Sequence, residues 1–124
     1  IEIHGDGTQS RCFGHVYDVV EGLTKLIETP ECFGTVVNLG NSEECSINDL
    51  AKRAIDLTGS SSQIKYISYD EAYGAGFEDM QRRVPSLEKA KRLIGYQPTR
   101  TLDDIINDVT AEYRKDSAGQ GTHA

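Results

Sequence analysis

Apolar residues recur at helical spacing in four stretches of the chain, and each stretch predicts an amphipathic helix. The stretches cover residues 17–28, 47–58 and 102–114 and the segment from Pro85-Ser86 to Ile94. Thr29-Pro30 is expected to stop the first helix, because proline supplies no backbone donor, and Gly59 to stop the second. Ser46 and Asp49 form a capping-box pattern before the second helix, and Ser86 has the residue type of a cap for the third.

Alternating or β-branched residues predict three short strands, so the fold class is α+β. The strands are expected at residues 1–4, 35–39 and 63–67. Glycine and aspartate at Gly5-Asp6-Gly7 predict a turn after the first strand, and 35–39 (TVVNL) is expected to be central or half-buried in a sheet. Residues 68–83 are aromatic and acidic without a regular period, which predicts a loop with at most one helical turn. Such a long loop is more often functional than a mobile surface excursion.

An arginine and an aromatic ring follow the first turn. In extended chain, Gln9, Arg11 and Phe13 point to one face, which suits a ligand that carries a phosphate and a flat ring. Arg82-Arg83 lie far along the chain, and if the fold brings them to Arg11, they would form a clamp on a diphosphate. The alternatives are a structural salt bridge for Arg11, and pairing of Arg82-Arg83 with the neighbouring acidic residues Glu78-Asp79.

Composition and charge narrow the function classes. The chain has 124 residues, of which 37% are hydrophobic and 27% charged, and no apolar run long enough to cross a membrane. The net charge of -7 disfavours binding to nucleic acid, where clustered cations must neutralise phosphates. Three widely spaced cysteines form neither a disulfide framework nor a zinc pattern, so we expect a cytoplasmic protein.

Catalytic signals are missing from the sequence. There is no glycine-rich dinucleotide fingerprint, and no spacing of His, Cys, Asp or Glu typical of a metal site. The carboxylates Glu43-Glu44 and Glu78-Asp79 are expected to be solvated rather than an acid/base pair. We therefore predict no catalytic, cofactor-binding or metal-ligating residue in these residues.

Several ordered motifs resemble one enzyme family. They are Gly5-Asp6-Gly7 with Gln9, Arg11, Phe13, His15-Val16 and Asp18; Val37-Asn38-Leu39-Gly40 with Ser46-Ile47; Gly76 to Met80 with Arg82 to Pro85; and Ile94 to Pro98. Together these motifs resemble the C-terminal, substrate-binding part of the extended short-chain dehydrogenase/reductases that act on nucleotide sugars. The group includes UDP-glucose 4-epimerases, UDP-glucuronate decarboxylases and dTDP-glucose 4,6-dehydratases.

The resemblance implies roles for six residues. Gln9 and Phe13 would lie along the nucleotide, and Arg11 and Arg83 would contact its diphosphate. Glu43 would lie near the base. Ser86 stands where the family usually has an aspartate that bonds a ribose hydroxyl, so it is either a substrate contact or only a helix cap.

The resemblance also implies an incomplete enzyme. Residues 1–116 would be a nucleotide-sugar-binding domain, residues 117–124 a disordered tail, and NAD would bind a Rossmann domain that these residues lack. The fragment would hold a UDP-sugar without catalysing a reaction, and the whole enzyme would be a homodimer. A UDP-glucose 4-epimerase is the first choice and a UDP-glucuronate decarboxylase or dTDP-glucose dehydratase the second. A stand-alone, non-catalytic binding domain is the alternative from another class.

Overall fold

The described part of this computed structural model comprises residues 1–77 and 79–119 and contains both helices and short strands. The strands are β1 (Glu2–His4), β2 (Ser10–Cys12), β3 (Glu44–Ser46) and β4 (Lys65–Ile67). The helices are α1 (Val16–Glu28), η1 (Pro30–Cys32), α2 (Ile47–Thr58), α3 (Tyr69–Tyr73), α4 (Glu88–Ile94) and α5 (Leu102–Gly119). The predicted α+β class is therefore confirmed, with the short helices η1 and α3 in addition to the four expected.

The strands form two separate pairs. β1 and β4 are parallel, and Ile3 lies opposite Tyr66. β2 and β3 are antiparallel, and Arg11 lies opposite Cys45. The predicted turn joins β1 to β2, with positive φ values at Gly5 and Gly7 that favour glycine. β2, which carries Arg11, thus follows this turn directly and pairs with β3.

The predicted start and stop signals of α2 are confirmed. The Ser46 hydroxyl oxygen accepts a hydrogen bond from the Asp49 amide at 3.0 Å and donates one to the Asp49 carboxylate at 2.8 Å. Gly59 ends the helix in the left-handed conformation. Residues 47–58 are the helix that the pattern predicts, because both of its ends are encoded locally.

The predicted strand at 35–39 is wrong, since these residues have no strand neighbour in the described part of the chain. Val36 is 85% exposed, and its carbonyl accepts a hydrogen bond from Lys89 Nζ. A strand needs a paired neighbour, and residue types alone do not supply one. The partner of β2 is instead β3, which the sequence did not predict.

The start of α4 and the end of α5 also differ from the prediction. Ser86 does not cap α4: Leu87 is the N-cap residue and makes no side-chain capping bond. The Ser86 carbonyl instead accepts a hydrogen bond from Asn38 Nδ2 at 3.4 Å. α5 continues to Gly119, beyond the expected end at Arg114, so the first residues of the predicted tail are helical. Residues 120–124 lie outside the described residues.

The loop at 68–83 contains one short helix, α3, in agreement with the prediction of at most one helical turn. Its rings cluster: Tyr73 stacks on Phe77 with 4.3 Å between ring centroids, and the Tyr73 hydroxyl lies 2.8 Å from His4 Nδ1. The aromatic residues of this loop therefore pack against one another and against the end of β1.

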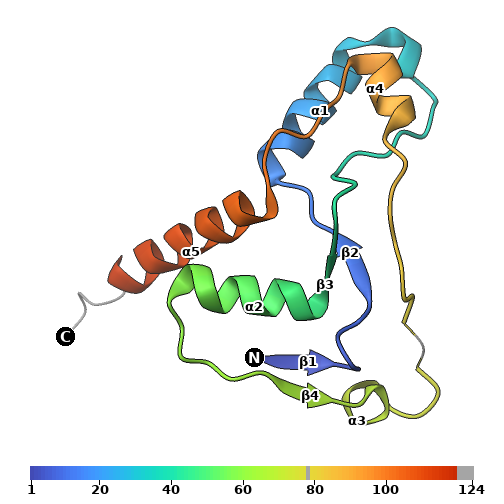
Figure 1. Cartoon of the computed structure of the whole chain (residues 1–124). Helices are drawn as coiled ribbons and strands as arrows, with labels where there is room; N and C mark the ends of the chain where they lie inside the picture. The colour runs from blue at the N-terminus through green and yellow to red at the C-terminus, as the bar shows by residue number, and fades with distance from the viewer. Residues whose placement is uncertain (78, 120–124) are drawn as a thin grey trace.

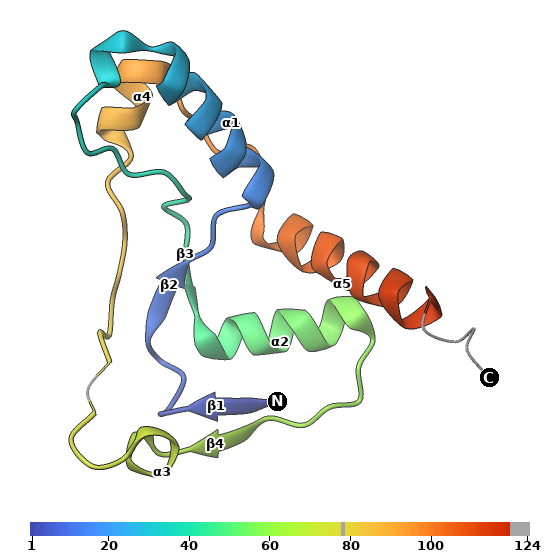
Figure 2. The same ribbon diagram turned by 180° about the vertical axis from the view of Figure 1, so that it is seen from behind.

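The elements pack in pairs. Figures 1 and 2 show α1 beside α4 at one end of the molecule, α5 beside α2, and β1 beside β4 at the other end. The buried Tyr96 follows α4 and connects the α1–α4 pair to the loop after η1. Its hydroxyl accepts a hydrogen bond from the Gly40 amide and donates one to the Gly40 carbonyl. No helix within the described ranges combines the length and apolar content needed to cross a bilayer.

One face of α1 is apolar and exposed. It carries Val16, Val20, Leu23 and Ile27, which follow one another at helical spacing. Helices of globular proteins normally bury such a stripe. We call these four residues the α1 stripe.

Candidate functional site

Arg11 and Arg83 line one open cleft of about 630 Å³, although they lie far apart in the sequence. β2 supplies Arg11, and the extended segment before α4, which runs alongside β2 in Figures 1 and 2, supplies Arg83. Phe13, Asn38 and Gly40 also line this space, which we call the arginine cleft. The fold thus brings together three of the six predicted site residues, Arg11, Phe13 and Arg83.

Arg11 is firmly held within the cleft. Its Nη1 donates hydrogen bonds of 2.7 Å to the carbonyl oxygens of Ser10 and Met80. Its Nη2 donates to Asp79 Oδ2 at 2.6 Å, which makes a salt bridge. The structural salt bridge considered for Arg11 is present, and Arg11 also lines the cleft.

Arg82 and Arg83 have different surroundings. Arg82 pairs with Glu44 through Nε and Nη2, the shortest contact being 2.6 Å, whereas Arg83 is exposed and lines the cleft. Neighbouring side chains of an extended segment point to opposite faces, which explains the difference. The hydrogen bonds from Arg82 and from the Ser10 hydroxyl lower the pKa of the Glu44 carboxyl below its ordinary value.

The alternative pairing of Arg82-Arg83 with Glu78-Asp79 is wrong for Arg82 and for Asp79. Arg82 pairs with Glu44 and Asp79 with Arg11, while Glu78 lies outside the described residues. Glu44 and Asp79 were expected to be solvated; Glu44 is exposed and pairs with Arg82, and the partly buried Asp79 pairs with Arg11. Their partners lie tens of positions away, so no local pattern in the sequence could identify them.

The remaining predicted site residues lie apart from the arginine cleft. Gln9 is 6% exposed, and its Nε2 donates to the His4 carbonyl at 3.0 Å, while its Oε1 has no partner among the described residues. Glu43 lines a separate small hollow of about 10 Å³ that Phe13 also borders. Ser86 is exposed just beyond the segment that carries Arg83.

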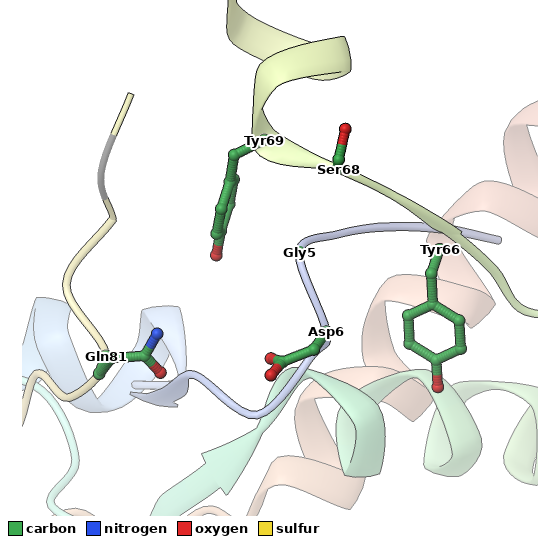
Figure 3. A pocket seen from close by; sticks show the side chains of 6 residues that line it. All are labelled: Gly5, Asp6, Tyr66, Ser68, Tyr69 and Gln81. Atoms are coloured by element: carbon green, nitrogen blue, oxygen red, sulfur yellow. The ribbon is translucent and has the colours of Figure 1, made fainter. Parts of the chain in front are cut away.

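A second hollow of about 630 Å³ lies beside the Gly5-Asp6-Gly7 turn. Figure 3 shows the side chains of Tyr69, Asp6 and Gln81 pointing into the space between them, with Tyr66 and Ser68 further along its wall. Burial, followed by the nearby Asp79 carboxylate, raises the pKa of the Tyr69 phenol. Asp79 thus acts electrostatically on Tyr69 and pairs with Arg11, which lines the arginine cleft.

The chain is similar to enzymes that act on nucleotide sugars. A family model described as GDP-mannose 4,6 dehydratase matches residues 1–109. The chain is 30% identical to a UDP-N-acetyl-alpha-D-glucosaminuronate decarboxylase from Bacillus cytotoxicus, over 91% of the chain and 35% of that protein. It is 33% identical to UDP-glucuronic acid decarboxylase 1 from Xenopus tropicalis, over 99% of the chain and 27% of that protein.

Solved structures of nucleotide-sugar enzymes are also similar to this chain. The UDP-glucuronic acid 4-epimerase from Bacillus cereus, in complex with UDP-glucuronic acid and NAD, matches with a TM-score of 0.77 and 28% identity. The match covers 93% of this chain and 35% of the epimerase chain, so the chain spans about a third of the length of such relatives. The chain belongs to the extended short-chain dehydrogenase/reductase family of nucleotide-sugar epimerases and dehydratases.

Proposed function

We propose that the arginine cleft binds the diphosphate of a UDP-sugar, as the substrate-binding lobe of an NAD-dependent enzyme of the UDP-glucose 4-epimerase type. The observation that carries the proposal is the meeting of Arg11 and Arg83 at one cleft. Two guanidinium groups from separate segments can grip neighbouring phosphates, and each charge-assisted contact contributes about 1.5–3 kcal/mol. In a chain of net charge -7, this local excess of positive charge is an evident place for an anion.

The cleft also offers contacts for the rest of a nucleotide. Phe13 supplies an aromatic ring, and Asn38 supplies a side-chain amide. Gln9, Glu43 and Ser86 remain proposed contacts, and for them the support is the family motif rather than their position in the cleft.

The chemistry itself is assigned to residues outside this sequence. NAD would supply hydride transfer, but the chain has no glycine-rich dinucleotide turn, and no tyrosine in it is followed four residues later by lysine. The lobe would therefore contribute positioning: binding energy from the nucleotide half holds the sugar at the reacting centre.

A Rossmann domain is the proposed partner of this lobe. The α1 stripe is apolar and exposed, and residues 35–39 have β-forming side chains without a strand neighbour in the described ranges. Both features suit burial against a sheet of another domain. The relatives are about three times as long as this chain, which accommodates such a domain.

A UDP-glucuronate decarboxylase is the second candidate, favoured by the two decarboxylases among the relatives. Full-length protein incubated with NAD and either UDP-glucose or UDP-glucuronic acid separates the two activities. Formation of UDP-galactose supports the epimerase, and release of carbon dioxide from the glucuronate supports the decarboxylase.

Calorimetry tests the diphosphate clamp. Arg11→Ala and Arg83→Ala should each weaken binding of UDP and UDP-glucose by on the order of tenfold or more, because each removes a charge-assisted contact. Arg92→Ala is the matched control, because Arg92 is an exposed arginine on α4 that does not line the cleft. Unchanged affinity in both cleft variants would contradict the clamp.

A further inference from the structure

Arg11 is held mainly by the segment that follows α3. A guanidinium has five N–H groups. Three of those in Arg11 are engaged, by the Ser10 carbonyl, the Met80 carbonyl and Asp79 Oδ2. Within the described part of the chain, the Nε–H and one Nη2–H have no partner and remain for a ligand.

We propose that Asp79 is a positioning residue that holds Arg11 ready for the diphosphate. This inference rests on the proposed function and extends it to a residue that contacts the arginine rather than the ligand. The side chains of Arg11 and Asp79 are only 18% and 29% exposed, so water screens their pairing less than it would on an open surface. An arginine already fixed in place loses less conformational freedom when it binds phosphate.

The effect of Asp79 on anion binding has two opposing parts. Its negative charge repels a diphosphate held by Arg11, and this repulsion alone would weaken binding. Its ion pair orders Arg11, and this ordering strengthens binding. Our proposal is that ordering outweighs repulsion. UDP affinity that falls when Asp79 is removed supports ordering, and UDP affinity that rises supports repulsion.

The segment that carries Asp79 has further attachments to β2. The Ser10 amide donates to the Gln81 carbonyl at 2.8 Å, and Arg82 pairs with Glu44 on the neighbouring strand. These contacts do not involve the Asp79 side chain. Replacing Asp79 should therefore loosen Arg11 without detaching the segment that carries Arg83.

The test compares Asp79→Ala and Asp79→Asn with the parent chain. Asp79→Ala should weaken UDP binding by about tenfold, the size of one charge-assisted contact, even though it removes a negative charge. Asp79→Asn keeps an oxygen acceptor for Arg11 and loses the repulsion, so it should bind UDP within about twofold of the parent chain or more tightly. Asp56→Ala on the exposed face of α2 controls for the change in net charge.

Two further measurements make the result specific. The Nε–H signal of Arg11 in nitrogen-15 NMR should report an ordered side chain in the parent chain and in Asp79→Asn, and a mobile one in Asp79→Ala. In an Arg11→Ala background, adding Asp79→Ala should no longer weaken UDP binding, because there is no arginine left to position.

The outcomes separate this inference from the proposed function. If the parent chain binds UDP and Asp79→Ala binds it equally well or more tightly, the positioning role is overturned. The diphosphate clamp then remains supported. Parent chain that shows an ordered Arg11 but no UDP binding contradicts the proposed function, and any role of Asp79 toward UDP is rejected with it.

Discussion

Asp18 shows how one residue joins distant parts of the chain. Its carboxylate accepts four hydrogen bonds, two each from Thr99 and Arg100, and its side chain is only 2% exposed. These bonds connect the first turn of α1 to the loop that leads into α5. Asp18 therefore supports the position of α1, whose start adjoins the arginine cleft.

Replacing Asp18 should destabilise the fold. Asp18→Asn keeps the size of the side chain but removes the charge that Arg100 pairs with, and we expect a loss of about 1.5–3 kcal/mol in the free energy of unfolding. Urea denaturation measures this loss. Asp56→Asn on the exposed face of α2 is the control and should change stability by less than about 0.5 kcal/mol.

Asp18 also contributes to the loss of folding stability at low pH. Burial by itself would raise the pKa of Asp18, but the hydrogen bonds from Arg100 and Thr99 outweigh it and hold the pKa below the ordinary value of 3.8. A lowered pKa in the folded state means that the stability is present above the unfolded pKa and is lost as pH falls through the folded one. Stability of the parent chain should therefore fall more steeply below about pH 4 than that of Asp18→Asn.

At the scale of single elements, the two candidate capping serines differ. Ser46→Ala removes a capping bond that is present at the start of α2 and should cost about 1 kcal/mol. Ser86→Ala removes none, because Leu87 occupies the N-cap position of α4, and should change stability by less than about 0.5 kcal/mol. Thermal unfolding of the two variants compares them directly, and equal losses would contradict the assignment of the caps.

Elements whose signals are local could be predicted from the sequence. The Gly5-Asp6-Gly7 turn, the Ser46 cap and the Gly59 stop each depend on residues within a few positions, and α2 was predicted to the residue. The end of α5 was placed too early because residues 117–119 are small or polar and predict a tail, although the helix continues through them to Gly119.

Long-range pairing could not be predicted. Nothing near Glu44–Ser46 distinguishes it as the partner of β2, whereas 35–39 has better strand-forming residues but no neighbour in the described ranges. Of the residues that the sequence predicts for a binding site, Arg11, Phe13 and Arg83 line the arginine cleft. The sequence did not identify Asp79 as the partner of Arg11, because that contact depends on how the loop after α3 folds back onto β2.

At the scale of the whole molecule, the arginine cleft depends on segments that lie far apart in sequence. β2, the loop at 38–41 and the segment before α4 each contribute to it. The buried Tyr96 fixes the second of these through Gly40, and the Glu44–Arg82 pair fixes the third against β3. The cleft is therefore a product of the tertiary fold and not of one motif.

The exposed segment at 35–39 has a further consequence for the isolated chain. Apart from the Val36 carbonyl, the backbone N–H and C=O groups of 36–39 make no hydrogen bond within the described part of the chain. A row of unpaired backbone N–H and C=O groups is a template for pairing with the same segment of another molecule.

Purified chain should therefore self-associate edge to edge as its concentration rises, and Val36→Lys should suppress this by placing a charge on the edge. Because Val36 is already exposed, the melting temperature measured on dilute protein should stay unchanged. Light scattering over a concentration series measures the association, and equal scattering by both proteins would contradict it. Solubility of the isolated chain would then be limited by one short segment, which a single lysine protects.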